Sequence, residues 1–531
     1  MNIFRYFENS VLTNPNGVCL FVGERQFSYA ELDNMVTQIA GLLLNDKEPF
    51  VGILACRSLT AYAGILAVLK SGKGYVPLSP RFPEERNKII KDLAGFKTLI
   101  VGKECLHEAK YMLKDNKQLA LIFPFIKKAE IKGLCLSSYN IYTQEDLTST
   151  KVETACTGKG DYAYMLFTSG STGTPKGVPI SHGNVRSYID YLANRYKINN
   201  SDKFSQLFDL TFDLSVHDLF LCWQGGAELH CIPEKSTMAP AKFIKDNELT
   251  FWFSVPSVGQ FMSRFKMLKP GVFPNLKYSL FCGESLPASI ADEWQHAAPN
   301  SVVENIYGPT EATIGISNYL WNPEKDRNKT HNGIVSIGKV FSTQEFAIVN
   351  EKNRLIQPGE EGELCLAGSQ VAIGYWNNQS KTREFFVRLS QKGEEVWYKT
   401  GDIVKVDVEG DIYYVSRKDC QVKIRGFRID LAEIDYIISE FTGETPVVSV
   451  PFPVDTGIVE SIYTFVPATL VQTQEDILCA CRRKLPDYMI PQGIITIEEF
   501  PHNANGKIDR NKLSSLIRKR YVQRTDSKSI K

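Results

Sequence analysis

The chain has 531 residues, of which 43% are hydrophobic and 23% are charged, as is usual for globular proteins that dissolve in water. A single core stops growing at roughly 250–300 residues, so this length predicts more than one domain. The formal net charge of +1 excludes the strongly basic field that nucleic acids or anionic membranes select. No apolar stretch reaches the ~18–20 residues that span a bilayer, so we expect neither nucleic-acid binding nor membrane insertion.

The twelve cysteines are spread thinly along the chain. Only Cys479 and Cys481 are close together, and their spacing lacks the paired Cys-x-x-Cys of a zinc site. The N-terminus shows no secretory signal. We therefore expect reduced thiols and a cytoplasmic location.

Strand and helix patterns alternate in the first part of the sequence. Short apolar runs at residues 50–55 and 98–101 predict buried strands, and residues 59–70 between them have helical spacing. Further strands are expected at residues 121–123, 163–167, 251–255 and 276–282. This alternation predicts an α/β fold with largely parallel sheets.

The pattern changes at about residue 338. Short segments at residues 345–349, 362–366 and 411–415 are rich in β-forming residues and bounded by Gly, Asn and Pro, which predicts a small barrel or meander. A charged stretch at residues 416–419 then precedes about 110 further residues. We place a domain boundary there, with a large domain at residues 1–418 and a small one at residues 419–531.

The loop at residues 167–177 combines hydroxyl residues, three glycines and a lysine. Glycines let backbone N–H groups approach phosphate oxygens, hydroxyls donate further hydrogen bonds, and lysine adds positive charge. A polyphosphate is the ligand that this composition favours, and the alternative is a flexible Gly/Ser connector. The loop is not a Walker A motif, because Pro175 stands five positions after Gly170. The candidate nucleotide-binding residues are Thr168, Ser169, Gly170, Ser171, Thr172, Gly173 and Lys176.

Six further motifs, read together with this loop, resemble the signature motifs of the adenylate-forming superfamily. They lie at residues 69–78, 212–215, 305–311, 398–402, 417–426 and 503–510, in the family's order and over nearly the whole chain. The chain is most similar to amino-acid adenylation domains of nonribosomal-peptide type. The resemblance implies a large N-terminal domain of layered α/β sheets with a small β-barrel-like part, and a small mobile α+β C-terminal domain.

The resemblance also assigns roles at the nucleotide. Lys507 would contact the substrate carboxylate and the transferring phosphoryl oxygens, where negative charge develops. Its alternative is an exposed lysine in an Asn-Gly turn. Thr310 would bond the α-phosphate, and Glu311 would hold Mg²⁺, a cation that takes oxygen ligands.

Three further residues would hold the nucleoside. Tyr307 would stack on adenine, Asp402 would accept hydrogen bonds from the ribose hydroxyls, and Arg417 would assist at the ribose. Taken alone, Tyr307 is equally well explained as a core aromatic residue and Asp402 as a turn aspartate.

Asp213 decides the substrate class. In this family an aspartate at that position pairs with the α-amino group of the amino acid, and a buried carboxylate without a cation would be costly. The alternative is that Asp213 caps the helix that begins at Leu214.

The side-chain pocket is expected to be mostly apolar and to contain no charged residue, which favours a small neutral amino acid. His217 is either a polar contact or a neutral, hydrogen-bonded wall residue. The motifs around the pocket resemble free-standing D-alanine:carrier-protein ligases and glycine or proline adenylases. By alignment of motifs, the pocket is lined by Leu214, His217, Ser254, Leu280, Cys282, Ile306, Ile314 and Gly315.

The implied reaction is ATP-dependent and Mg²⁺-dependent. Proline, glycine or alanine would be converted to an aminoacyl-AMP with release of pyrophosphate, then passed to the phosphopantetheine thiol of a separate carrier protein. Asp419 lies where the family has its hinge. Two alternatives stay open, an acyl- or aryl-CoA synthetase and a non-catalytic nucleotide-binding protein.

Overall fold

The structure of the chain is a computed structural model. It describes residues 1–112, 119–134, 139–148, 151–158, 160–170, 173–326, 329–453, 458–502 and 508–526. Contacts divide the chain into two units. Unit 1 comprises Met1–Pro80, Ile90–Phe167 and Gly177–Lys418, and unit 2 comprises Arg81–Ile89, Thr168–Lys176 and Asp419–Lys531.

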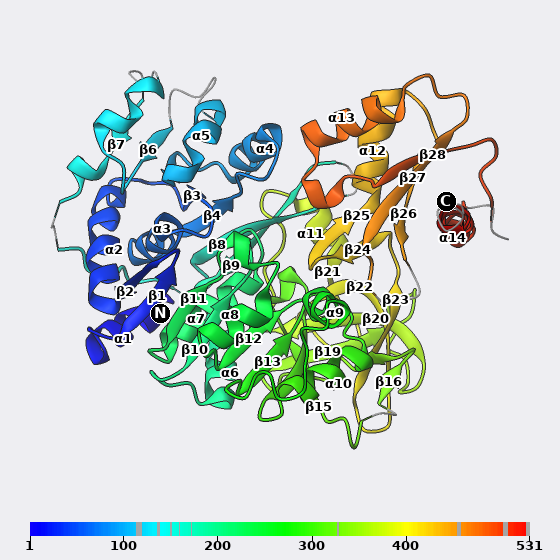
Figure 1. Cartoon of the computed structure of the whole chain (residues 1–531), viewed down its shortest axis with the longest axis horizontal. Coiled ribbons are helices and arrows are strands. Elements are labelled where there is room, and N and C mark those ends of the chain that lie inside the picture. Colours follow the sequence, from blue (N-terminus) through cyan, green and yellow to red (C-terminus); the bar gives the residue numbers. More distant parts are fainter. Residues whose placement is uncertain are drawn as a thin grey trace. The chain divides into compact units, whose positions relative to one another are not determined.

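The largest sheet described in unit 1 has nine strands, drawn from the N-terminal (blue) and middle (green) parts of the chain in Figure 1. Its inner strands are parallel, and its two margins are antiparallel. In sheet order the strands are β18 (Lys339–Val340), β15 (Ser317–Trp321), β14 (Val302–Tyr307), β13 (Tyr278–Phe281), β12 (Phe251–Ser254), β10 (Lys203–Gln206), β11 (Glu228–Cys231), β1 (Val18–Val22) and β2 (Arg25–Ser28).

A second sheet of seven strands has parallel pairs from β7 to β8. Such strands are buried on both faces and read as continuous apolar runs, as β3 and β5 do. In sheet order its strands are β7 (Ile141–Tyr142), β6 (Ala120–Ile122), β5 (Thr98–Val101), β3 (Phe50–Leu54), β4 (Gly74–Leu78), β8 (Tyr162–Thr168) and β9 (Lys176–Ser181).

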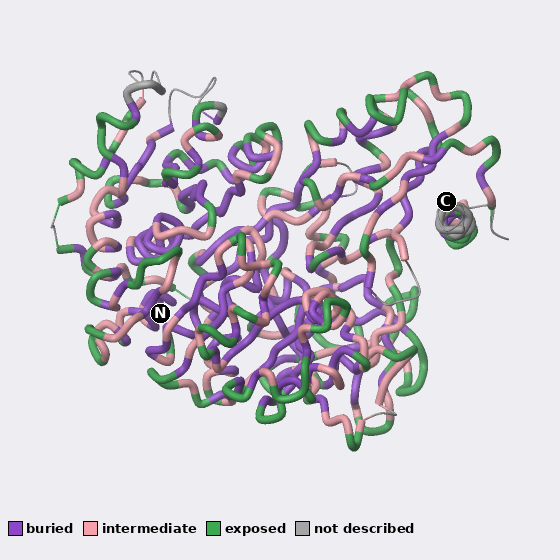
Figure 2. The backbone as a smooth tube through the Cα atoms, in the orientation of Figure 1, coloured by how far each residue is buried: buried purple, intermediate pink, exposed green. Residues whose placement is uncertain are grey.

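Helices cover these sheets. Many of the buried residues belong to one large core, and a second core is formed by residues between Ile232 and Val335. In Figure 2 buried positions follow the strands, and exposed positions gather in the connecting loops. The helix α3 is apolar all round and buried along nearly its whole length, as expected for a helix enclosed by other elements. The helices are α1 (Phe4–Thr13), α2 (Tyr29–Leu43), α3 (Leu59–Lys70), α4 (Glu84–Ala94), α5 (Leu106–Met112), α6 (His182–Tyr196), α7 (Leu214–Gln224), α8 (Pro240–Asp246), α9 (Pro256–Arg264), α10 (Ala288–Ala297) and α11 (Gln379–Phe385).

The β-rich region expected after residue 338 is a five-stranded antiparallel sheet. Its strands are β19 (Gln344–Val349), β20 (Glu361–Gly368), β22 (Val396–Val406), β21 (Phe386–Arg388) and β23 (Ile412–Arg417). The short hairpin of β16 (Thr330–His331) and β17 (Ile334–Val335) precedes it in the chain.

Unit 2 is an α+β unit with its own apolar core. The helix α12 packs on α13 and β26, and α14 packs on β26. Its C-terminal part contains a hairpin of β24 (Gln421–Ile424) and β25 (Phe427–Asp430), a sheet of β26 (Val448–Phe452), β27 (Ser461–Pro467) and β28 (Gly493–Ile497), and the helices α12 (Leu431–Thr442), α13 (Gln474–Lys484) and α14 (Arg510–Asp526).

The predicted α/β class is confirmed, with parallel sheets in the first part of the chain and an antiparallel one after residue 338. Across the described ranges, every helix is too short or too polar to cross a bilayer.

The turn at Gly338 admits no side chain. Its φ is +71°, and a Cβ there would lie 1.9 Å from the carbonyl oxygen of Asn318. Gly333 has a similar φ of +76°, but nothing lies within 4 Å of its Cβ position. Alanine substitutions at these two positions therefore distinguish the cost of a strained backbone, present at both, from the cost of steric overlap, present only at Gly338.

We expect Gly333→Ala to lower the free energy of unfolding by ~1–2 kcal/mol, the cost of a left-handed alanine. Gly338→Ala should lose a further ~1–3 kcal/mol, because the strand that supplies Asn318 must move. Urea unfolding of both variants measures the difference, and equal losses would contradict the steric explanation.

Candidate active site

The candidate substrate pocket forms at the carboxyl ends of three neighbouring parallel strands, where ligands bind in open α/β sheets. Ser254 ends β12 and pairs in register with Phe281, the last residue of β13, which in turn pairs with Asn305 of β14. Sheet register therefore places the backbone of Ser254 beside Leu280, Cys282 and Ile306, and these four residues come from three distant stretches of sequence. All four side chains are buried. The Oγ of Ser254 accepts from Nε1 of Trp252 at 3.0 Å.

A second wall comes from α6 and α7, which pack against each other. His217, in the first turns of α7, shares a 2.7 Å hydrogen bond between its Nδ1 and the hydroxyl of Tyr188 on α6. Its ring centroid lies 4.2 Å from that of Phe253. Burial lowers the pKa of His217 to about 3, so this side chain is neutral near neutral pH and belongs to a hydrogen-bonded wall.

Gly315 closes the same wall. A Cβ at this position would lie 2.5 Å from Cγ2 of Ile306 and 3.4 Å from Cε2 of Tyr188. Leu214 and Ile314 are also buried. The structure thus gathers Tyr188, His217, Ile306 and Gly315 into one continuous surface, of which Tyr188 was not anticipated from the sequence.

The backbone that carries Ile314 is strained. Thr313 and Ile314 have φ values of +58° and +73°, which are outliers for β-branched residues and are found where surrounding structure enforces them. Gln370 supplies that constraint, because its Nε2 donates to the carbonyl of Gly315 at 2.7 Å while its own carbonyl accepts from Thr313 Oγ1 at 2.5 Å. No local motif identifies Gln370 in the sequence.

Asp213 directly precedes α7 and is only 4% exposed. It stands at the N-cap position, but its side chain makes no capping hydrogen bond and its backbone is already helical. The capping alternative is therefore wrong. The carboxylate of Asp213 adds to the effect of burial in raising the pKa of Tyr75 on β4, of Tyr164 on β8 and of the wall residue Tyr188.

The three candidate nucleoside residues contact one another. The hydroxyl of Tyr307 donates to Oδ2 of Asp402 at 2.5 Å, and Nη1 of Arg417 donates to Oδ1 at 2.7 Å. The same arginine nitrogen also donates to the carbonyl of Thr400 at 2.9 Å. Burial, with a further contribution from Asp402, raises the pKa of Tyr307 well above its usual range. A buried carboxylate is thus fixed beside an aromatic ring.

Glu311 lies in a short turn, η5 (Thr310–Ala312), and its side chain is fully buried. The Tyr375 hydroxyl donates to Oε1 at 2.7 Å, and the backbone N–H of Ala372 donates to the Glu311 carbonyl at 2.8 Å. A fixed carboxylate of this kind suits a hard cation such as Mg²⁺. The role of Tyr375 in holding Glu311 is a long-range contact that the sequence did not indicate.

Within unit 2, the glycine-rich loop lies against the start of α12. Ser169 Oγ donates to the carbonyl of Arg428 at 2.9 Å and accepts from the N–H of Asp430 at 3.0 Å. The N–H of Gly170 donates to Oε2 of Glu433 at 3.3 Å, and Oε1 of Glu433 pairs with Arg86 at 2.8 Å.

The hydrogen bond between Gly170 and Glu433 bears on the predicted ability of the loop to bind phosphate. The loop N–H of Gly170 donates to an oxygen of the buried Glu433 side chain, and a phosphate-binding loop uses its N–H groups for acidic oxygens in the same way. Burial raises the pKa of Glu433, and Arg86 opposes this rise. A phosphate oxygen and Glu433 would therefore compete for the same donor.

Other predicted residues fall at element ends or outside the described ranges. Lys176 begins β9 and is buried, and Thr168 ends β8. The carboxylate of Asp419, the first residue of the C-terminal part of unit 2, accepts from the N–H of Gln421 at 3.1 Å. The predictions for Ser171, Thr172 and Lys507 concern positions outside the described residues.

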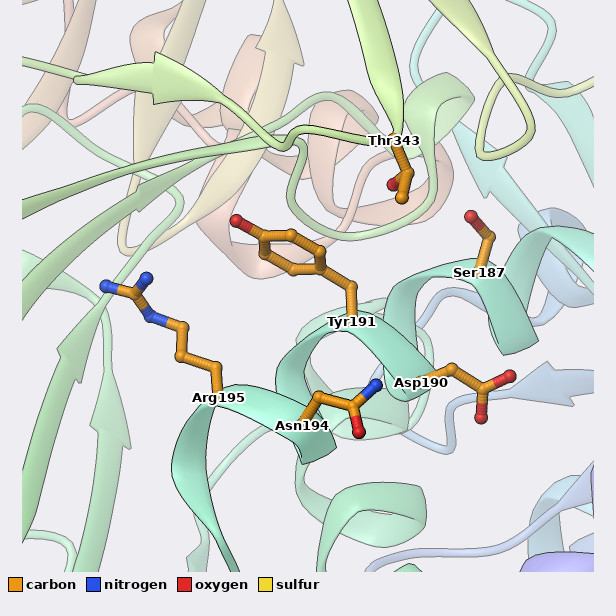
Figure 3. A pocket seen from close by; sticks show the side chains of 6 residues that line it. All are labelled: Ser187, Asp190, Tyr191, Asn194, Arg195 and Thr343. Atoms are coloured by element: carbon orange, nitrogen blue, oxygen red, sulfur yellow. The ribbon is translucent and has the colours of Figure 1, made fainter.

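A separate hollow of about 460 Å³ lies on α6. Figure 3 shows Tyr191, Asn194 and Arg195 projecting from this helix, with Thr343 contributed by another segment. None of its lining residues is a predicted site residue, so it is distinct from the pocket formed at the strand ends.

Comparison with known proteins identifies the family. The family model described as AMP-binding enzyme matches residues 7–376. The chain belongs to this family, which confirms the resemblance of its motifs to adenylate-forming enzymes.

Individual relatives give a more specific comparison than the family model. The chain is 29% identical to the D-alanine–D-alanyl carrier protein ligase of Bacillus licheniformis, over 97% of this chain and 100% of that protein. It is 30% identical to zwittermicin A synthase ZmaJ of Bacillus cereus, over 98% of this chain and 96% of that protein. It also matches bacitracin synthase 1 of Bacillus licheniformis at 29% identity, but it spans only 9% of that protein's length.

Among solved structures, the chain is similar to the Vibrio cholerae adenylation domain AlmE, which was determined in complex with glycyl-adenosine-5'-phosphate. The TM-score is 0.89 at 29% identity, covering 97% of this chain and 98% of that one.

The neutral state of His217 has a consequence for stability. Its pKa is about 3 in the folded protein and about 6.5 in an unfolded chain. Between these values the unfolded state binds more protons, so the stability that neutral His217 contributes falls as the pH drops below about 6.5.

From about pH 7 to about pH 5 we expect the parent to lose about 2 kcal/mol more unfolding free energy than His217→Gln. Urea unfolding over this pH range is the measurement, and His296→Gln, at an exposed histidine, is the control. Parallel pH profiles for the parent and His217→Gln would show that His217 is not held neutral by burial.

Proposed function

We propose that this protein activates a small neutral amino acid, with proline, glycine and alanine as the leading candidates. ATP and Mg²⁺ would be used to form the aminoacyl-AMP and release pyrophosphate. The amino acid would then pass to the phosphopantetheine thiol of a separate carrier protein.

The observation that carries this proposal is the buried carboxylate of Asp213, which directly precedes the helix that supplies the wall residues Leu214 and His217. The α-ammonium group of an amino acid is a cation that a carboxylate at this position can bind by a charge-assisted hydrogen bond. The eight predicted wall residues are buried and include no Asp, Glu, Lys or Arg that could pair with a charged side chain of the substrate. A small substrate is favoured because the side chains of Ile306 and Tyr188 lie so close to Gly315 that little space is left there.

The relatives support the same class of substrate. One is named for D-alanine and a carrier protein, and the AlmE structure contains glycyl-adenosine-5'-phosphate. Both substrates are small and carry an α-ammonium group, as the proposed role of Asp213 requires.

For the nucleotide we assign Tyr307 to adenine, Asp402 and Arg417 to the ribose, and Thr310 with residues 168–173 and Lys176 to the phosphates. The buried carboxylate of Glu311 fits Mg²⁺, because it supplies a rigid oxygen ligand. Bound there, the ion would neutralise phosphate charge during attack by the amino-acid carboxylate.

We assign the catalytic lysine to Lys507 in the small domain, residues 419–531, and ATP and amino-acid binding to residues 1–418. Asp419 would be the hinge at which the backbone changes between adenylation and carrier loading.

Amino-acid-dependent exchange of pyrophosphate into ATP tests the function directly. The common amino acids and D-alanine are assayed in parallel with des-amino acids, such as propionate. Exchange with one small amino acid, and poor exchange with its des-amino analogue, is expected. Preference for a carboxylic acid without an amino group would favour an acyl- or aryl-CoA synthetase, and no exchange with any acid would favour a non-catalytic protein.

Asp213→Asn should raise the amino-acid concentration needed for half-saturation by at least about thirtyfold while that for ATP changes little. The substitution keeps the size of the side chain but leaves the substrate ammonium uncompensated, which costs ~2–5 kcal/mol. Asp218→Asn, on the helix that follows Asp213, is the matched control, because it makes the same substitution at a buried aspartate outside the predicted site residues. Unchanged amino-acid saturation in Asp213→Asn would refute the ammonium contact.

Lys507→Ala should slow pyrophosphate exchange by ~10²–10³ while ATP binding stays within a few-fold, because its charge acts mainly in the transition state. Lys512→Ala, at an exposed lysine paired with Asp509, controls for loss of charge in the same unit. An exchange rate for Lys507→Ala within about threefold of the parent would exclude a transition-state role.

A further inference from the structure

Two cysteines and a carboxylate meet in unit 1, at a place that the proposed function does not use. Cys56 follows β3 and Cys105 follows β5, and these strands are parallel neighbours in the seven-stranded sheet. Glu104 and Cys105 belong to a 3-10 turn, η1 (Lys103–Cys105). The carboxyl ends of two adjacent strands thus bring residues about fifty positions apart into one cluster.

The ligand atoms of the cluster converge. The two sulfur atoms and a carboxylate oxygen of Glu104 all lie within 4.8 Å of one another, and this is the one such group of three or more potential metal ligands in the described part of the chain. A tetrahedral site with Zn–S bonds of about 2.3 Å places its sulfur atoms about 3.8 Å apart. The ligand atoms therefore need to shift by no more than about 1 Å.

Local hydrogen bonds hold Glu104 in place. Its Oε1 accepts from the backbone N–H of Cys56 at 3.0 Å and from the hydroxyl of Ser58 at 2.6 Å. The turn itself is anchored to β3, because the N–H of Gly102 donates to the carbonyl of Leu54 at 2.9 Å. The carboxylate and Cys56 are consequently ordered before any ion binds.

A further carboxylate lies near the cluster, because Glu108 follows Cys105 by three residues on α5. One oxygen of Glu108 is buried, with no hydrogen-bond partner among the described residues. Lys103, in the same turn as Glu104, pairs with Glu130.

We propose that Cys56, Glu104 and Cys105 form a binding site for a divalent cation of the zinc class. Thiolate and carboxylate ligands together match the preferences of Zn²⁺ and Cd²⁺, in contrast to the oxygen-only ligands of Mg²⁺. Binding releases the two thiol protons to solvent and transfers no electron. The ion can enter from solvent, because Cys56 and Glu104 are exposed while Cys105 forms the buried end of the site.

The proposed metal site lies next to a hydrogen bond with the segment that precedes Asp213. Arg57 directly follows Cys56, and its Nη1 donates to the carbonyl of Leu207 at 2.6 Å. A bound ion would fix the backbone next to this arginine and hence the start of the segment at residues 207–213.

The test uses the full chain, fully reduced and stripped of metal. Zn²⁺ is titrated in competition with a chromogenic chelator, and Cd²⁺ is followed by thiolate-to-metal charge-transfer absorption. We expect one tight equivalent for the parent protein. Cys56→Ser and Glu104→Gln should each weaken binding by at least about tenfold, and the metal should raise the melting temperature of the parent but not of these variants.

Both variants change exposed side chains, so the buried packing of Cys105 is left intact. Cys156→Ser and Cys479→Ser remove exposed cysteines outside the cluster and should bind metal like the parent. The proposal is wrong if no stoichiometric site appears, if Cys56→Ser or Glu104→Gln binds as tightly as the parent, or if the control variants lose as much affinity.

A redox role is a separate outcome. Treatment with a small-molecule disulfide, followed by thiol counting and peptide mapping, detects a Cys56–Cys105 disulfide. If that disulfide forms readily while the reduced protein binds no equivalent of Zn²⁺ or Cd²⁺, the pair is a redox pair and the metal proposal fails.

Discussion

The compensation of buried carboxylates is the constraint on which the candidate active site depends. Removing a carboxylate from water is costly, so each one needs a fixed donor or a counter-ion. Asp402 has Tyr307 and Arg417, Glu311 has Tyr375, and Glu433 has Arg86. These contacts join segments far apart in the sequence, so satisfying the charges also fixes how those segments meet.

The sequence predicted the fold class and the family resemblance, because regular elements and motifs are local signals. Residues 59–70 have helical spacing and form α3, and the apolar run at residues 98–101 forms β5. Contacts such as those of Gln370 with Gly315 and of Tyr375 with Glu311 could not be predicted in this way. They join distant segments, and neither partner has a sequence pattern that reveals the other.

Two parts of the site depend on geometry that contradicts local preference. Thr313 and Ile314 adopt positive φ values that β-branched residues disfavour, so propensity alone would have placed this backbone elsewhere. Asp213 stands where helix-capping rules expect a cap, yet it makes none. Sequence rules describe the commonest use of a residue type, and a binding site is where an uncommon use is stabilised by the rest of the fold.

Because Gln370 holds the strained turn by hydrogen bonds, the backbone shape of the pocket and the chemical character of its wall depend on different residues. Backbone shape there is set by these hydrogen bonds and by sheet register, whereas the chemical character of the wall is set by side chains such as His217 and Ile306. Substitutions can therefore change the side chains of the wall without moving the backbone that carries them. A scaffold divided in this way can acquire a new substrate preference through a few substitutions during evolution, while its nucleotide chemistry is inherited unchanged.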